Sequence, residues 1–382
     1  MTSLRDLAPR PRRAGVSSLG FINGRRILRA GIGALCAVLA LAGIALATRA
    51  WLSSRIRKAD SIRCPPGIEW SGYVKINGVP QWVLIRGDDL RNPILLFLHG
   101  GPGSPLTALA GKHYSAGLEK HFVVVHWEQR GAGKSYNPAL ERVPLSNATL
   151  VSDVDALTRY LLSSYHRERL YLIGHSWGSL LGVIAITDHP ERYYGFIGVG
   201  QFVNAIDQER ISLHFTLDFL KRKGDKAGMA KLAAIGEPPY SQPYDDILEE
   251  RMALLHTGGS LGPNYPISRS LTDAVLCPTF EISDIWRAPK GFSYSLRGVF
   301  NDEYWHWALD KTHRSFSVPT YFFIGHLDYN TPFELVERYF DQIEAPKKEK
   351  VVFEEAAHMI PFEDPERFNR EVIRVFAPSA GQ

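Results

Sequence analysis

The sequence predicts an α/β protein with a mostly parallel central sheet flanked by helices, an inserted and mainly helical cap domain, and an N-terminal transmembrane helix. Three observations predict this class. Short runs that are apolar on both faces alternate with stretches of helical period, as in parallel sheets covered by helices. Residues 205–315 contain no such run, and residues 30–47 carry no charged side chain.

The composition is that of an ordinary globular protein. Of the 382 residues, 45% are hydrophobic and 22% are charged, which excludes wholesale disorder and fibrous architectures. The length suits one large domain with an insertion, or two domains. Three cysteines are too few for a disulfide framework or a Cys-rich metal site, so we expect no metal and no cofactor.

The positive charge is concentrated at the N-terminus. Residues 1–29 form a basic arm with seven arginines and one aspartate, more than enough to account for the formal net charge of +4. The remaining body is close to neutral, so we expect no nucleic-acid partner.

Residues 30–50 predict a membrane segment. Residues 30–47 would rise about 27 Å as a helix, close to the bilayer hydrocarbon thickness of about 30 Å, and Trp51 follows as an interfacial aromatic. Ala45-Leu46-Ala47 also fits a cleaved signal peptide, but an uncleaved single-pass anchor is favoured. The arginine flank predicts a cytoplasmic amino end and a body on the extracytoplasmic side, or secreted to the periplasm after cleavage.

The elements of the body follow in order. Residues 51–70, which include Pro65-Pro66, predict a linker, and alternating runs at 72–76 and 81–85 flank Asn77-Gly78, a strong hairpin signal. Residues 147–165 have apolar positions at helical spacing. Buried strands are predicted at residues 93–98, 122–126, 170–173, 195–199, 321–324 and 350–353.

The segment 205–315 divides the body. It holds helical pieces, Pro- and Gly-rich loops and an aromatic cluster, and it is too long for a simple connection between two strands. We therefore predict a first core part at 71–204, a cap domain at 205–315 and a second core part at 316–382.

The sequence Gly174-His175-Ser176-Trp177-Gly178 predicts a nucleophile. It directly follows the strand at 170–173 and opens a helical stretch, and a serine nucleophile needs such a sharp strand-to-helix turn with small residues on either side. Ser176 is therefore the expected nucleophile.

A serine nucleophile needs a base and an acid that orients the base. On this arrangement the expected chain order is serine, acid, histidine, with the last two on loops after later strands. Asp328 follows the strand at 321–324 and His358 follows the strand at 350–353. We predict that Asp328 is the acid and His358 the base.

Backbone N–H groups are needed to stabilise the oxyanion that forms during acyl transfer. The turn His99-Gly100-Gly101-Pro102-Gly103 directly follows the strand at 93–98. Pro102 has no N–H, so Gly101 is the expected donor, together with Trp177 after the nucleophile. We expect His99 to hold the turn rather than to react.

These motifs together resemble a known family. The HGGPG turn, the segment WEQRGAGKS at 127–135, GHSWG, the GHLD at 325–328 and the His358 segment are similar to the α/β-hydrolase serine peptidases typified by prolyl iminopeptidase. The resemblance covers roughly residues 72–375. It implies the triad Ser176, Asp328 and His358, an oxyanion hole of Gly101 and Trp177, a mostly helical cap and aminopeptidase activity.

In those peptidases, acidic cap residues bind the free α-amino group of the substrate. Candidates here are Glu281, Asp284, Asp302 and Glu303, while Trp305 belongs to an aromatic cluster that lines an apolar substrate pocket or forms cap core.

Two departures from the family pattern leave the substrate open. Glu128 stands where the family usually has an aspartate, and His175 replaces the common glycine before the nucleophile, as in esterase-type hydrolases. We therefore expect a serine hydrolase that cleaves small peptides or esters through an acyl-enzyme. The alternatives are a carboxylesterase or lipase-like hydrolase without peptidase activity and a non-catalytic binding protein of this fold. Pairing of Cys64 with Cys277 and the oligomeric state stay open.

Overall fold

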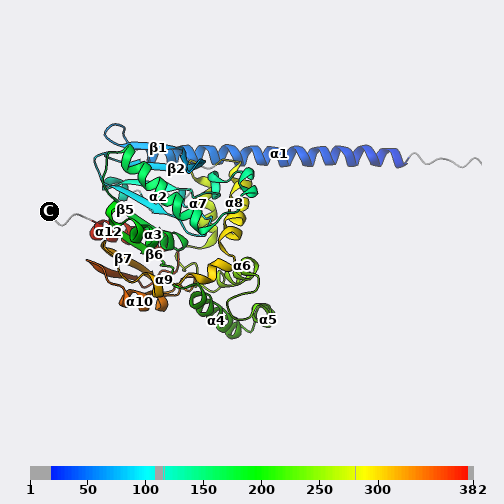
Figure 1. The fold of residues 1–382 in the computed structure, drawn as a ribbon. Helices are drawn as coiled ribbons and strands as arrows, with labels where there is room; N and C mark the ends of the chain where they lie inside the picture. Colours follow the sequence, from blue (N-terminus) through cyan, green and yellow to red (C-terminus); the bar gives the residue numbers. More distant parts are fainter. Residues whose placement is uncertain (1–18, 108–114, 116, 280, 377–382) are drawn as a thin grey trace, which may run out of the picture. The chain divides into compact units, whose positions relative to one another are not determined.

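A computed structural model describes residues 19–107, 115, 117–279 and 281–376 (Figure 1). The chain divides into two compact units, and the boundary between them in the sequence lies between Ser54 and Arg55. Residues 1–18 of the predicted basic arm lie outside the described residues.

The N-terminal helix is longer than the predicted span. Helix α1 runs from Leu19 to Ala59, so the first part of the predicted linker is helical. The physical reason is that neither glycine nor proline occurs between Gly43 and Pro65 to end the helix. Its stretch Ile27–Ala59 is long and apolar enough to cross a membrane, and it is the only such helix in the described part of the chain.

The second unit contains an eight-stranded sheet of order β1-β2-β4-β3-β5-β6-β7-β8. Strands β1 and β2 are antiparallel to each other, β2 is antiparallel to β4, and the neighbours from β4 to β8 are parallel. This confirms the predicted mostly parallel α/β sheet. The strands are β1 Ile68–Ile76, β2 Val79–Gly87, β3 Ile94–Leu98, β4 Val123–Trp127, β5 Leu170–His175, β6 Tyr193–Val199, β7 Thr320–Gly325 and β8 Lys348–Phe353.

The predicted hairpin is confirmed. Ile76 pairs with Val79 across a two-residue turn, in which Asn77 and Gly78 have φ of 44° and 82°. Positive φ at both positions is what this turn type requires and what Asn-Gly tolerates.

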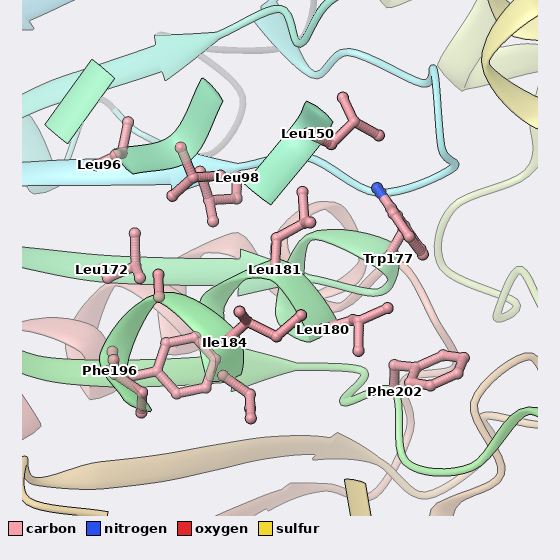
Figure 2. Close-up of a cluster of buried hydrophobic side chains, with 14 of the residues drawn as sticks. Leu96, Leu98, Leu150, Leu172, Trp177, Leu180, Leu181, Ile184, Phe196 and Phe202 are labelled. Atoms are coloured by element: carbon pink, nitrogen blue, oxygen red, sulfur yellow. The ribbon is translucent and has the colours of Figure 1, made fainter. Parts of the chain in front are cut away.

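Helices cover the sheet. Helix α2, Asn147–Ser164, matches the predicted helix and begins after the N-cap Ser146, whose hydroxyl accepts the Thr149 N–H. In helix α3, Trp177–Asp188, the side chains Leu180, Leu181 and Ile184 pack against buried side chains of the sheet (Figure 2). The remaining core helices are α10 Phe333–Gln342, α11 Ile360–Glu363 and α12 Pro365–Phe376, with 3-10 turns η2 Leu118–Lys120, η3 Gly133–Ser135, η4 Pro138–Arg142 and η5 Pro190–Arg192.

The described part of residues 205–315 is helical, as predicted for the cap. It lies in the same compact unit as the sheet, so its boundaries at 205 and 315 stay a prediction. Its elements are α4 Ala205–Lys223, α5 Lys226–Ile235, α6 Pro243–Leu254, α7 Ile267–Leu276, α8 Asp284–Val299, η6 Asp302–His306 and α9 Leu309–Thr312. Cys64 and Cys277, whose pairing the sequence left open, are not joined by a disulfide in the described structure.

Candidate active site

Ser176 lies at the turn between β5 and α3. Its backbone has φ 53° and ψ −123°, an uncommon conformation for a residue other than glycine, and its N–H donates to the Val199 carbonyl at 2.9 Å. A Cβ on Gly174 would lie 2.4 Å from the Gly178 carbonyl oxygen, and one on Gly178 would lie 2.3 Å from that of Leu98. The glycines on either side of Ser176 are therefore required by close backbone packing.

Asp328 and His358 meet at the carboxyl ends of β7 and β8. Asp328 Oδ2 lies 2.8 Å from His358 Nδ1, and both side chains are buried. The Asp328 carboxylate also accepts hydrogen bonds from the backbone N–H of Asn330 and Thr331 and from the Thr331 hydroxyl. Three donors from one turn thus hold the carboxylate against the imidazole.

Glycine residues bring Ser176 and the His358–Asp328 pair to one place. Gly200, which follows β6, has φ 51°, and a Cβ there would lie 2.9 Å from His358 Nδ1 and 3.2 Å from Asp328 Oδ2. A Cβ on Gly100 would lie 2.9 Å from the Ser176 Cβ. The parallel strands therefore bring these groups to one edge of the sheet.

The imidazole of His358 has further neighbours. Its Nε2 lies 3.1 Å from the Asn330 Nδ2, which donates to it when Nδ1 carries the proton. His175 donates from Nε2 to the His358 carbonyl at 2.9 Å, and the two rings are 4.8 Å apart. Burial, followed by the proximity of His358, lowers the pKa of His175 to about 3, so His175 is neutral and positions the loop of His358.

Glu363 holds the same loop from the other side. Its carboxylate accepts the N–H groups of Ala357 and Met359, which flank His358, at 2.8 and 3.0 Å. Burial raises the pKa of Glu363 although these hydrogen bonds oppose the shift. Sequence reasoning missed this residue, because nothing local marks a helical glutamate as a loop anchor.

The HGGPG turn is braced by His99. Its Nδ1 donates to the Gly100 carbonyl at 2.8 Å, and its Nε2 accepts the N–H of Gln129 at 3.0 Å. Burial lowers the pKa of His99 to about 4, so the ring is neutral and its tautomer is set by these two partners. His99 holds the turn, as expected. Gly101 in this turn has φ 113°.

Glu128 joins two loops beside this turn. Its buried carboxylate accepts hydrogen bonds from the Thr107 hydroxyl and from the Lys134 N–H. Burial raises the pKa of Glu128 to about 7, and the hydrogen bonds reduce that shift. Glu128 therefore titrates close to neutral pH.

The four acids predicted from the resemblance lie in two different places. Lys134 Nζ is 2.7 Å from Asp284 Oδ2 and 3.4 Å from Glu281 Oε1, so these two already have a cationic partner. Asp302 and Glu303 are exposed on η6. Trp305 packs against Tyr240 and Tyr304, with ring centroids 5.4 and 5.2 Å away.

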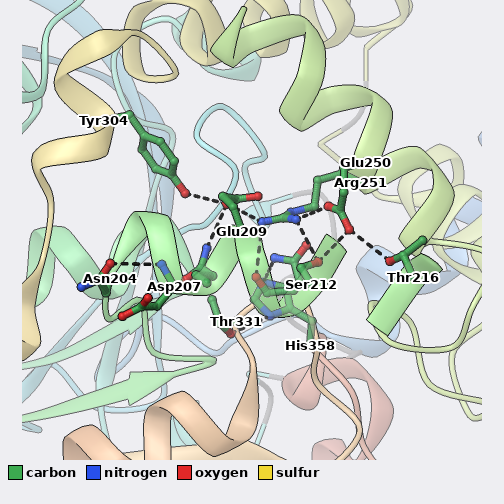
Figure 3. A network of polar contacts seen from close by, with 12 residues as sticks. Asn204, Asp207, Glu209, Ser212, Thr216, Glu250, Arg251, Tyr304, Thr331 and His358 are labelled. Carbon is green, nitrogen blue, oxygen red and sulfur yellow. Dashed lines mark hydrogen bonds and ion pairs between the residues drawn. The ribbon is translucent and has the colours of Figure 1, made fainter. Parts of the chain in front are cut away.

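A different set of acids forms a buried network in the cap (Figure 3). Glu209 of α4 accepts from Arg251 Nη2 at 2.7 Å and from the Tyr304 hydroxyl at 2.8 Å, and Arg251 also pairs with Glu250. Both carboxylates are fully buried, and Glu209 Oε2 has no hydrogen-bond partner in the described part of the chain. Burial raises the pKa of Glu209.

This network reaches the loop that carries Asp328. Arg251 Nη2 lies 3.5 Å from the carbonyl of Asn330, whose side chain contacts His358. The sequence did not predict a role for Glu209 and Glu250, because they lie within charged helical segments whose pattern predicts an exposed surface. Only their burial distinguishes them.

The chain was compared with known proteins. Residues 95–371 match the model of the alpha/beta hydrolase family. The chain is 30% identical over 303 residues to a probable aminopeptidase of Bacillus subtilis, covering 79% of this chain and 94% of the relative.

Two solved structures share the fold. A proline iminopeptidase of Mycobacterium smegmatis is 19% identical, with a TM-score of 0.56 over 80% of this chain and 97% of its own. An esterase of Exiguobacterium antarcticum is 18% identical, with a TM-score of 0.54 over 80% of this chain and 98% of its own. The resemblance predicted from the motifs is confirmed, and the chain belongs to the alpha/beta hydrolase family as an enzyme with hydrolase activity.

Proposed function

We propose that this chain is a serine hydrolase that removes an N-terminal aminoacyl group, prolyl included, from short peptides through an acyl-enzyme on Ser176. The observation that carries the proposal is the buried His358–Asp328 pair at 2.8 Å, placed by Gly200 at the same sheet edge as Ser176. Similarity to a probable aminopeptidase supports the interpretation that the chain is a peptidase.

In this mechanism Ser176 Oγ attacks the substrate carbonyl carbon while His358 Nε2 accepts the hydroxyl proton. Asp328 holds Nδ1–H and stabilises the imidazolium that forms. The oxyanion accepts hydrogen bonds from the N–H groups of Gly101 and Trp177; Trp177 is the first residue of α3, where an N–H has no intrahelical partner. The leaving amine takes the proton from His358, and water then releases the acyl group by the reverse proton transfers.

Ser176→Ala tests the nucleophile. We expect turnover to fall by about 10⁴-fold or more with an unchanged melting temperature, because only one hydroxyl oxygen is removed and the backbone of the turn is kept. A fluorophosphonate probe should label the parent enzyme at Ser176 and leave the variant unlabelled. Full activity of Ser176→Ala towards every substrate would rule out the mechanism.

The α-amino group of the substrate needs a negative partner, and we propose Glu209 for that role. Glu209, Glu250 and Arg251 together carry one net negative charge when both acids are ionised, and this cluster contacts the Asp328 loop at Asn330, whose side chain contacts His358. Glu281, Asp284 and Lys134 carry the same net charge, but Glu281 is exposed and these ion pairs join the start of α8 to η3.

Kinetics with free and N-blocked aminoacyl arylamides separate these candidates. We expect Glu209→Gln to raise KM for the free-amine substrate roughly tenfold and to leave N-blocked ester hydrolysis unchanged. Glu281→Gln is the matched control and should behave as the parent. Equal losses on both substrates would mean that Glu209 is purely structural.

A carboxylesterase is the second candidate function. The observation that favours it is His175 before the nucleophile, where the imidazole contacts the His358 loop. A panel of aminoacyl arylamides and p-nitrophenyl esters, each with a free or a blocked amine, tests this alternative. Equal hydrolysis rates for the free and blocked substrates would favour the esterase and contradict the aminopeptidase.

A further inference from the structure

The cap exposes large apolar side chains on α7 and around the start of α8. Leu271 of α7 is 63% exposed, Ile282 and Ile285 are each 64% exposed, and Trp286 is 43% exposed. Ile282 lies two residues before α8 and its carbonyl accepts the Ile285 N–H at 3.2 Å, while Ile285 and Trp286 lie in the first turn of α8. We call Leu271, Ile282, Ile285 and Trp286 the cap patch.

The cap patch is flanked by cations in the manner of an interfacial helix. The Arg287 guanidinium lies 5.4 Å and the Lys290 ammonium 5.7 Å from the ring of Trp286. Tryptophan beside long basic side chains is typical of helices that lie at the level of lipid head groups, where the ring is half-buried and the cations reach the phosphates.

The end of the apolar N-terminal helix contacts the same part of the cap. Arg57 donates from Nη2 to the carbonyl of Pro278 at 2.8 Å, in the connection between α7 and α8. Arg57 follows Ala47, the last residue of the uncharged run, by ten residues, or about 15 Å of helix. The connection between α7 and α8 is therefore bonded to Arg57, ten residues along the chain from the end of the uncharged run in the predicted membrane segment.

We propose that the cap patch docks on the surface of the bilayer in which the N-terminal helix is inserted. The basic side chains Arg57 and Lys58, together with Arg287 and Lys290, would face anionic head groups. The occupant is lipid because the chain itself supplies an apolar helix whose last turn is bonded, through Arg57, to the connection that leads into α8. A second copy of the chain is the outcome that would contradict this choice.

Quenching of Trp286 by brominated lipid tests the proposal. The full-length chain is reconstituted into vesicles of phosphatidylcholine and phosphatidylglycerol, with or without bromine on the upper part of the acyl chains. The contribution of Trp286 is the difference between the parent and Trp286→Phe. We expect this contribution to lose most of its intensity in the brominated vesicles.

Controls separate docking from insertion and from folding. Ile282→Glu combined with Ile285→Glu should abolish the quenching of Trp286, whereas Met252→Glu, at a 52% exposed position of α6, should not. Equal melting temperatures in detergent show that the variants are folded. Trp51→Phe reports insertion of the N-terminal helix in the same way.

Quenching of Trp51 without quenching of Trp286 overturns the docking proposal. Absence of quenching at both positions overturns it as well, together with the membrane anchor. An unquenched Trp286 in a chain that sediments as a dimer assigns the cap patch to a second copy. None of these results depends on hydrolase activity, so the proposed function is tested separately.

Discussion

At the residue scale, single backbone positions set the geometry of the proposed catalytic groups. Gly200 adopts φ 51° directly against the His358–Asp328 pair, and Ser176 itself has positive φ. Strain of this kind is maintained because the surrounding strands determine it. Small changes at such positions should therefore affect activity more than stability.

Gly200→Ala is expected to reduce kcat/KM roughly 100-fold, because its methyl group would displace His358 Nδ1, now 2.9 Å from that site. The positive φ alone costs about 1 kcal/mol of unfolding free energy. Gly224→Ala, also at positive φ but in open space, should show the same loss of stability with full activity. Similar activities for the two variants would contradict the placement of His358.

At the element scale, buried carboxylates hold loops in place by accepting hydrogen bonds from them. Glu363 of α11 holds the two N–H groups that flank His358, and Glu128 after β4 joins Thr107 to η3. Neither acid is expected to touch substrate. Their effect is to hold the loops on which the site is built.

Glu363→Gln should lower kcat several-fold and destabilise the fold by about 1–3 kcal/mol, because the amide nitrogen cannot accept one of the two loop N–H groups. Thermal unfolding and steady-state kinetics measure the two effects. Glu366→Gln, on the exposed side of α12, is the control and should change neither.

Glu128 predicts a pH dependence of stability. Its pKa is about 7 in the folded state against 4.5 for the free side chain, so between these values the native state holds a proton that the unfolded state has lost. The contribution of this group to stability therefore falls as pH rises through that window, by on the order of 2–4 kcal/mol in total.

Thermal unfolding of Glu128→Gln across pH 5 to 8 checks this sign. The melting temperature of Glu128→Gln should fall much less between pH 5 and 8 than that of the parent, because the amide does not titrate. Glu303→Gln, at an exposed position, should retain the parent profile. A parent-like decrease in Glu128→Gln would show that another group titrates.

At the scale of the whole molecule, the charge and hydropathy of the N-terminus bear on where the protein is located in the cell and not on the reaction that it catalyses. No side chain is buried in the 18-residue apolar window of Ile27–Ala59, which is compatible with a membrane span or a signal sequence. We predict that the full-length chain sediments with membranes and resists extraction by high salt.

Leu39→Arg places a charge near the middle of this helix, where insertion costs about 3 kcal/mol more, and should shift the chain to the soluble fraction. Ile27→Arg, outside the uncharged run, is the control and should stay in the membrane. A mature chain that begins after Ala47 would identify a cleaved signal peptide and contradict the anchor.

The sheet, the hairpin at Asn77-Gly78, the turn at Ser176 and the positions of Asp328 and His358 after their strands could all be predicted from the amino-acid sequence. These features depend on local periodicity, on glycine at close backbone contacts and on the rule that parallel strands share a carboxyl edge. Such signals are contained within a few consecutive residues.

The identity of the polar residues around the site could not be predicted from the sequence and is visible only in the folded chain. Glu209, Glu250 and Arg251 come from helices that look solvent-exposed in sequence, yet they are buried together, while Asp302 and Glu303 stay on the surface. The partner of Asp284 is Lys134, 150 residues away in the chain. Burial and pairing of this kind depend on how the cap packs on the core, because an ionised side chain becomes buried only where a distant segment supplies its partner.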